Sequence, residues 1–293
     1  MNASNPRAGI LLMIATTFVF ACQDGISRHL AGEYNTFMVV MIRYWFFAAF
    51  VLTVAARRPG GIRATARTSQ PVLQIGRGIL LALEICVAVV GFTLIGLVES
   101  HAIFASYPLI ITALAGPLLG EQVGWRRWAA VLVGFAGMLI ILAPGAGAFD
   151  PLALIPVGSA VLFALYSIAT RYAARRDSTA TSFFWTGIAG AVVMTLVGLP
   201  AWEPMTPPDW AWMLLLCATG VLGHWLLIKC YELAEVSVVQ PFAFFHQMFA
   251  ALVGLFVFAE VIRANVIFGA AIILAAGLFA LWRAARAAEA DDA

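Results

Sequence analysis

Charged residues are scarce in this sequence. Only 11% of its 293 residues are Asp, Glu, Lys or Arg, whereas 63% are hydrophobic and the mean hydropathy is +0.95. A soluble domain of this length carries about 25% charged residues. No part of the chain is polar enough to form a separate soluble domain. The composition therefore excludes a soluble protein and predicts that lipid surrounds most of the chain.

Motifs for catalysis and for metal or phosphate binding are also missing. The sequence contains no GxSxG, no HExxH and no phosphate-binding loop. Its four histidines have no ligand-like spacing, and its four cysteines lie inside apolar stretches without a C-x2-C pair. The basic residues are interpreted as determinants of membrane topology. We therefore expect no enzymatic activity, no cofactor, no metal and no nucleic-acid partner.

Long apolar stretches fill most of the chain. Crossing the hydrocarbon core takes about 20 apolar residues in a helix. Ten such stretches occur, at 8–29, 36–56, 75–96, 100–119, 125–143, 152–172, 180–199, 210–231, 236–258 and 264–282. With both termini in the cytoplasm, 14 of the 17 Lys and Arg residues lie on the cytoplasmic side, as the positive-inside rule requires. The sequence predicts an all-α integral membrane protein with ten transmembrane helices.

The two halves of the chain share a pattern. Glu121 and Glu260 each end an apolar stretch, each precedes a helix rich in small residues, and they lie 139 positions apart. Five helices per half would give the halves opposite orientations, which is typical of transporters that work by alternating access. We predict repeats at 8–143 and 152–282 and a short cytoplasmic tail at 283–293. The alternative is that two glycine-rich apolar helices align by chance.

Glu84 is the sharpest candidate for a functional residue, because ionisable side chains at membrane depth are costly and rarely incidental. It lies near the middle of its predicted helix, and adding 139 gives position 223, next to His224. We expect both side chains to face a central cavity, where Glu84 would bind an ammonium group or carry a proton and His224 would titrate near neutral pH. The alternative for both is a structural hydrogen bond between helices.

A second candidate set is Asp24, Arg28 and Arg43. Asp24 and Arg43 lie at similar depth on neighbouring antiparallel helices, and Arg28 lies one helical turn from Asp24. Since buried charges need partners, we predict a structural ion pair here, with an outer gate as the alternative.

Further residues are predicted to line or shape the cavity. Aromatic walls with a few polar groups suit a small metabolite, although single aromatic side chains in membrane helices more often serve packing. The predicted lining residues are Tyr107, Tyr166, Trp185, Gln240, Phe244, His246 and Gln247. Pro108 and Pro241 are predicted to bend their helices beside the cavity, where the freed carbonyls find other partners.

The pattern Pro108 … Gly120-Glu121 … Trp128 … Gly134 … Gly137, echoed by Glu260 … Gly269 … Gly277, resembles the EamA domain of the drug/metabolite transporter superfamily, in two tandem copies that cover essentially the whole chain. Glu84-Ile85-Cys86, Tyr107-Pro108 and Tyr166 are similar to YddG-type amino-acid exporters. Asp24 … Arg28, Arg43-Tyr44, Gly223-His224 and Pro241-Phe242 also resemble S-adenosylmethionine carriers. One departure is that Gln247 stands at the second-half position matching Pro108.

This resemblance implies a secondary transporter of amino acids or related small metabolites across the bacterial inner membrane, with export expected. Uptake of S-adenosylmethionine or another bulky metabolite is the alternative within transport, and a membrane-embedded enzyme is the alternative of another class. The expected partners are a small-molecule substrate and the lipid bilayer, and the expected state is a monomer or a homodimer.

Overall fold

The computed structural model describes residues 6–119, 125–142, 151–233, 242–243 and 245–291, and its elements in these ranges are all helices. The α-helices are α1 (Pro6–Glu33), α2 (Thr36–Ala56), α3 (Gly61–Ala66), α4 (Pro71–Leu94), α5 (Leu97–Phe104), α6 (Tyr107–Leu119), α7 (Trp125–Leu142), α8 (Leu154–Ala173), α9 (Thr179–Gly198), α10 (Pro207–Leu233), α12 (Phe245–Val257) and α13 (Ala264–Asp291). Two 3-10 turns, η1 (Pro151–Ala153) and η2 (Leu199–Ala201), precede α8 and follow α9.

Six helical segments of the described chain are long and apolar enough to cross a membrane. They are Arg7–Glu33, Thr36–Ala56, Pro71–Leu94, Pro151–Ala173, Thr179–Ala201 and Pro207–Leu227. The other four predicted spans coincide with shorter apolar helices, at Leu97–Ile111, Trp128–Leu142, Phe245–Val257 and Ala264–Phe279. An all-helical fold with several membrane-spanning helices is therefore confirmed, whereas the number ten stays a prediction. Helix α13 continues through the first nine residues of the predicted tail, whose cytoplasmic location stays a prediction.

Local sequence signals set the helix boundaries. Asn35 caps α2 by accepting a hydrogen bond from the Phe37 amide at 2.9 Å, and Ser178 caps α9 by accepting one from Thr181 at 3.1 Å. Pro71 and Pro207 are the first residues of α4 and α10, where a missing amide proton costs nothing. These caps explain why the long helices begin where the apolar pattern begins.

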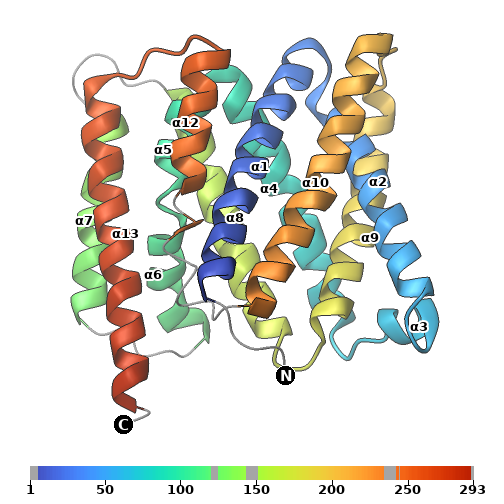
Figure 1. Ribbon diagram of the computed structural model, residues 1–293, viewed down its shortest axis with the longest axis horizontal. Coiled ribbons are helices and arrows are strands. Elements are labelled where there is room, and N and C mark those ends of the chain that lie inside the picture. The colour runs from blue at the N-terminus through green and yellow to red at the C-terminus, as the bar shows by residue number, and fades with distance from the viewer. Residues whose placement is uncertain (1–5, 120–124, 143–150, 234–241, 244, 292–293) are drawn as a thin grey trace.

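The long helices alternate in direction along the chain, with α5 and α6 following one another in the same direction, so that α1 begins and α13 ends at the lower end of the molecule in Figure 1. The short helix α3, not expected from the sequence, lies at this lower end (Figure 1). We call the opposite end, where α1 leads into α2, the upper end.

Helix neighbours follow a repeated scheme. Helix α1 of the first half of the chain packs against α10 and α12 of the second half. Helix α8 of the second half packs against α4 and α6 of the first half. Two further pairs, α2 with α9 and α7 with α13, each join a helix from one half of the chain to one from the other. If the five-helix units are superposed in order, α1 corresponds to α8, α4 to α10, and α6 to α12. The contacts of α1 with α10 and α12 are therefore equivalent to the contacts of α8 with α4 and α6.

Glycine brings α7 and α13 into backbone contact. A Cβ atom added at Gly137 would lie 2.8 Å from the Gly269 carbonyl oxygen, and one added at Gly269 would lie 2.5 Å from the Gly137 carbonyl oxygen. Small residues at such crossings let membrane helices associate without a hydrophobic driving force. This pair therefore needs both glycines.

The predicted helix at 100–119 is broken. Helix α5 ends at Phe104 and α6 begins at Tyr107, so Pro108 is the second residue of a new helix rather than a bend within one. The Ser106 carbonyl accepts hydrogen bonds from Leu109 at 3.0 Å and Ile110 at 3.2 Å, which starts α6. The break lies inside the protein, where non-helical backbone is tolerated at membrane depth.

Candidate functional site

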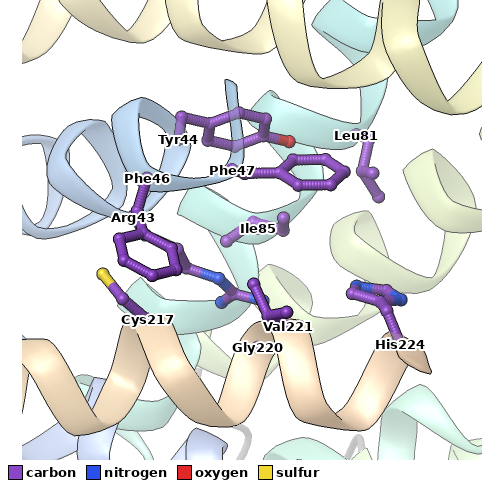
Figure 2. Close-up of a pocket in the computed structure, with 10 residues that line it drawn as sticks. All are labelled: Arg43, Tyr44, Phe46, Phe47, Leu81, Ile85, Cys217, Gly220, Val221 and His224. Atoms are coloured by element: carbon purple, nitrogen blue, oxygen red, sulfur yellow. The ribbon is translucent and has the colours of Figure 1, made fainter. Parts of the chain in front are cut away.

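A pocket that is partly open to the surroundings lies between α2, α4 and α10 (Figure 2). Its lining residues are Arg43, Tyr44, Phe46, Phe47, Leu81, Ile85, Cys217, Gly220, Val221 and His224. Most of this wall is apolar, and Arg43 and His224 supply its nitrogen donors (Figure 2). An apolar pocket with a few convergent polar groups is the usual form of a small-molecule site.

His224 lies in an aromatic box. Its ring stacks on Phe47 with centroids 6.2 Å apart and planes 15° apart, and Phe20 and Phe183 meet it edge-on at 5.4 and 5.9 Å. The rings come from α1, α2, α9 and α10. Such a box offers flat apolar surfaces to a planar group. His224 thus lies in the wall of this pocket, and its role in substrate binding stays a prediction.

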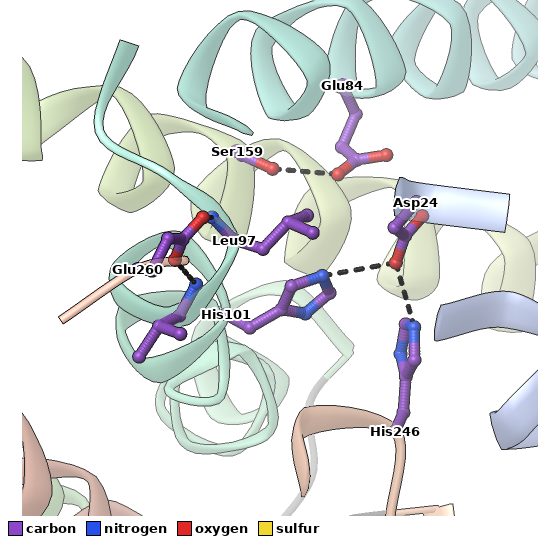
Figure 3. Close-up of polar contacts among 8 residues, drawn as sticks. Asp24, Glu84, Leu97, His101, Ser159, His246 and Glu260 are labelled. Carbon is purple, nitrogen blue, oxygen red and sulfur yellow. Dashed lines mark hydrogen bonds and ion pairs between the residues drawn. The ribbon is translucent and has the colours of Figure 1, made fainter. Parts of the chain in front are cut away.

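Glu84 is buried and is not among the residues that line this pocket. Its side chain is 5% exposed, and its Oε1 accepts a hydrogen bond from the Ser159 hydroxyl of α8 at 2.8 Å (Figure 3). Arg43 lies close enough for its charge to interact with the Glu84 carboxylate. Tyr44 is 2% exposed, and its hydroxyl has no hydrogen-bond partner within the described part of the chain. A carboxylate, a guanidinium and an uncommitted hydroxyl therefore lie in one region.

Asp24 is not paired with Arg43 or Arg28, so the predicted ion pair is wrong. Its Oδ2 lies 3.1 Å from His101 Nε2 and 2.9 Å from His246 Nε2 (Figure 3). The prediction treated 100–119 as one straight helix and compared depths only between neighbouring helices. Helix α5 is a separate segment, and its His101, rather than Arg43, lies beside Asp24 of α1.

Arg28 pairs with Glu260 at the upper end. The Glu260 carboxylate also accepts hydrogen bonds from the amides of Leu97 and Val98, both at 2.8 Å, and so caps the first turn of α5 (Figure 3). Gly96 precedes this turn with φ +93°, and a Cβ atom there would lie 2.7 Å from Glu260 Oε1. Only glycine leaves room for the carboxylate and adopts this backbone conformation readily.

Arg77 organises the lower end of α4. It is 2% exposed and donates to groups on α4, α8 and α9. The acceptors are Gln74 Oε1, Tyr166 Oη, Thr170 Oγ1, the Ser182 carbonyl and Thr186 Oγ1, at 2.6 to 3.3 Å. These bonds explain how a guanidinium stays buried without a directly bonded carboxylate among the described residues.

Asp177, in the turn between α8 and α9, completes this network. It accepts hydrogen bonds from Gln74 Nε2 at 2.8 Å and from the Thr68 hydroxyl. Desolvation raises the pKa of the Asp177 carboxyl, but these hydrogen bonds lower it by more, so its pKa lies below the ordinary value. Gln74 thus links the negative charge of Asp177 to the positive charge of Arg77.

The predicted aromatic residues do not all meet. Tyr107 contacts Phe163 with ring centroids 4.8 Å apart, and Tyr166 lies 6.0 Å from Phe163 and beside Arg77. Trp185 does not join them, because its Nε1 donates to the Ala66 carbonyl of α3 at 3.0 Å. None of Tyr107, Tyr166 and Trp185 lines the pocket in Figure 2, and their role in substrate binding stays a prediction. Indole N–H groups inside a protein seek an acceptor, and α3 supplies one.

Two more predicted residues belong to α12, and three cannot be placed. His246 contacts Asp24, and the Gln247 side-chain oxygen is buried with no hydrogen-bond partner within the described ranges. Gln240, Pro241 and Phe244 lie outside the described residues.

Sequence reasoning missed His101, Ser159, Arg77 and the capping role of Glu260. Arg77 was counted only as a cytoplasmic charge. Its position six residues into an apolar helix was a usable signal, because charges there rarely face lipid. His101 carried no comparable signal, since its partners come from α1 and α12.

The chain was compared with known proteins. It matches the EamA-like transporter family over residues 7–143 and 152–282. It is 29% identical to an S-adenosylmethionine uptake transporter of Rickettsia bellii over 89% of each chain, and 30% identical to a riboflavin transporter of Vibrio cholerae over 92% of this chain and 91% of the other. It is 23% identical to a pseudopaline exporter of Pseudomonas aeruginosa over 92% of this chain and 94% of the other.

A solved crystal structure shares the fold. It aligns with a TM-score of 0.61 over 95% of this chain and 96% of that chain, at 20% sequence identity. The family match covers nearly the whole chain in two copies, and the relatives named above carry small metabolites. The chain therefore belongs to the EamA-like transporter family, and it is a transporter of small metabolites rather than an enzyme.

Proposed function

We propose that this protein carries a bulky metabolite that contains an amino-acid group, and that S-adenosylmethionine is its first candidate substrate. The observation that carries the proposal is that the Glu84 carboxylate lies within range of the Arg43 charge, and that Arg43 and His224 of the aromatic box line one pocket. An amino-acid group presents an ammonium and a carboxylate. Glu84 is suited to the ammonium and Arg43 to the carboxylate, because a guanidinium binds a carboxylate in a planar, bidentate way.

The aromatic box supports a substrate larger than a simple amino acid. The near-parallel His224 and Phe47 rings, with Phe20 and Phe183 around them, offer stacking surfaces for a purine. The similarity to S-adenosylmethionine uptake transporters over 89% of each chain agrees with this assignment. Simple amino acids remain the second candidate, since Glu84, Arg43 and the Tyr44 hydroxyl alone would hold the amino-acid group.

For the mechanism we propose alternating access between two inverted repeats, 8–143 and 152–282. The equivalent contacts of α1 with α10 and α12, and of α8 with α4 and α6, support two units related by symmetry. We also propose that the lower end faces the cytoplasm, because Arg57, Arg58, Arg63 and Arg67 follow α2 there. Both termini would then be cytoplasmic in the inner membrane.

Transport into proteoliposomes tests the substrate. Labelled S-adenosylmethionine should enter faster than into empty liposomes, and unlabelled S-adenosylmethionine should compete with it. Riboflavin, which has neither an ammonium nor a carboxylate, should not compete. Competition by simple amino acids with equal strength would favour the second candidate. If riboflavin competes and S-adenosylmethionine does not, the proposal fails.

Variants test the site. Glu84→Gln and Arg43→Gln should each weaken S-adenosylmethionine binding about tenfold to a hundredfold, as expected for losing a charged hydrogen bond of about 1.5–3 kcal/mol. The matched controls are Glu33→Gln and Arg63→Gln, because both of these side chains are exposed at the helix ends. Unchanged affinity in the Glu84 and Arg43 variants would remove both residues from the site.

A further inference from the structure

Three ionisable side chains from separate helices meet at one oxygen atom. Asp24 of α1 places its Oδ2 3.1 Å from His101 Nε2 of α5 and 2.9 Å from His246 Nε2 of α12 (Figure 3). The His101 side chain is 3% exposed, that of Asp24 15% and that of His246 21%. The pocket wall in Figure 2 contains none of the three residues. We refer to them as the Asp24 cluster.

The Asp24 cluster has an unfilled proton position. Each neutral imidazole carries one N–H and one lone pair. Both ring nitrogens of His101 lack a hydrogen bond of good geometry within the described part of the chain, although Nε2 lies close to the Asp24 carboxylate. With both imidazoles neutral the cluster carries a charge of −1, and one added proton makes it neutral. Because a net charge at membrane depth is costly, uptake of one proton would remove the cost of that charge.

Among the residues that the structure describes, no Lys or Arg side chain forms an ion pair with Asp24. On α1, Cys22 interacts with Asp24, and Glu84 of α4 adds a second negative charge that acts on it. Arg43 of α2 acts on Glu84, and His224 of α10 packs on Phe20, one turn from Asp24. At the upper end Arg28 is engaged by Glu260. The Phe92 ring of α4 stacks on His101 with centroids 5.1 Å apart.

The equivalent place in the other half is uncharged. With the offset of 139 residues, Asp24 corresponds to Phe163, His246 to Tyr107 and His101 to Gln240. The Tyr107 and Phe163 rings lie 4.8 Å apart, so the Asp24–His246 contact has a structural counterpart without an ionisable group. Packing alone is thus satisfied by aromatic residues at this position. The carboxylate and imidazoles are an addition in one half only.

We propose that the Asp24 cluster is a proton-binding site that couples substrate movement to proton movement. This inference rests on the transporter function and on the inverted repeats proposed above. His246 belongs to the second repeat, whereas Asp24 and His101 belong to the first. A proton on the cluster strengthens the attraction across the repeat boundary, and its release weakens it. The proton arrives from water on one side and leaves to water on the other, so no other reactant is needed.

The first test measures the proton site without any substrate. In purified protein labelled with 15N-histidine, NMR titration should show His101 and His246 titrating together. In Asp24→Asn both should lose the proton at lower pH, whereas Asp24→Glu should restore much of the wild-type behaviour. His29→Asn is the matched control and should leave the titration of His101 and His246 unchanged, because His29 is 40% exposed and contacts Asp209 rather than the Asp24 cluster. If His101 and His246 titrate independently and do not respond to Asp24→Asn, the proposal is overturned.

The second test measures coupling in proteoliposomes with labelled S-adenosylmethionine, the membrane potential being clamped with K⁺ and valinomycin. A gradient of one pH unit should sustain about tenfold accumulation if one proton moves per substrate. Asp24→Asn and His246→Asn should abolish this accumulation but keep exchange of labelled for unlabelled substrate. If both variants keep exchange and still accumulate substrate as strongly as the wild-type protein, the coupling is overturned. Absence of all S-adenosylmethionine movement would instead contradict the proposed function, leaving the titration to decide the proton site.

The same residue types also suit a transition metal. The purified protein should contain less than stoichiometric zinc, copper, nickel or iron by elemental analysis, and chelation should leave exchange unchanged. Stoichiometric metal that is lost in Asp24→Asn would overturn the proton site in favour of a metal site.

Discussion

Replacing Glu260 tests whether a single carboxylate joins three elements at the upper end. The side chain accepts two amide hydrogen bonds from α5, pairs with Arg28 of α1 and belongs to the segment between α12 and α13. Glu260→Ala leaves two amides without an acceptor and Arg28 without its counter-charge. Losing a cap costs about 1 kcal/mol, and each charge-assisted hydrogen bond contributes about 1.5–3 kcal/mol. Since the carboxylate is only 12% exposed, we expect a loss of about 3 kcal/mol of unfolding free energy.

Glu99→Ala is the matched control at the same end of the molecule. Glu99 pairs with Arg263, whose side chain is 48% exposed, and exposed pairs of this kind contribute about 0–1 kcal/mol. In thermal unfolding of the detergent-solubilised protein, about 3 kcal/mol corresponds to a decrease in Tm of roughly 6–12 °C. Glu99→Ala should lower it by roughly 0–4 °C.

The Arg28 contribution can be separated with a double-mutant cycle. Arg28→Met and Glu260→Gln should show a coupling energy of more than about 1 kcal/mol, because the charges touch and are partly buried. If Glu260→Ala and Glu99→Ala lower Tm equally, or if the cycle shows no coupling, then the capping argument is wrong.

Two further predictions concern packing and the buried cation. Gly137→Ala should lower Tm by several degrees, because the new methyl group would lie 2.8 Å from the Gly269 carbonyl oxygen. Gly158→Ala is the control and should leave Tm unchanged or raise it, because its methyl group would have no neighbour within 4 Å. Equal effects of the two substitutions would contradict the backbone contact of α7 and α13. Arg77→Gln should cost about 3 kcal/mol or more, because it strips donors from the Ser182 carbonyl and the Thr170 and Thr186 hydroxyls, and the exposed Arg63→Gln is its control in the same unfolding assay. An Arg77 variant as stable as the control would show that these bonds contribute nothing.

The sequence was sufficient for the elements that lipid alone determines. Apolar length located the six long helices. The sequence also marked the helices that carry Gly137 and Gly269 as rich in small residues, but it did not show that they pack against each other. It was insufficient where several short segments meet. The break at residues 105–106 arises because the Ser106 carbonyl accepts the first hydrogen bonds of α6. As a result, α5 is a separate helix whose His101 lies beside Asp24.

Depth along a helix axis says how far a side chain lies from the membrane surface but not which way it points. This is why Arg43 and Asp24 were paired although they face different partners. The hydrogen bond of Trp185 was missed for a related reason, because its acceptor belongs to α3, a helix of six residues in the stretch between two predicted spans.

The pairs α2·α9 and α7·α13 lie at opposite ends of the row of helices (Figure 1). Each pair joins the first half of the chain to the second along one edge, and the pair α7·α13 is in backbone contact through its glycines. In the alternating access proposed above, the two pairs would act as pivots, so that widening the upper end would narrow the lower end. The protein would then need no separate gate at either end to prevent an open passage.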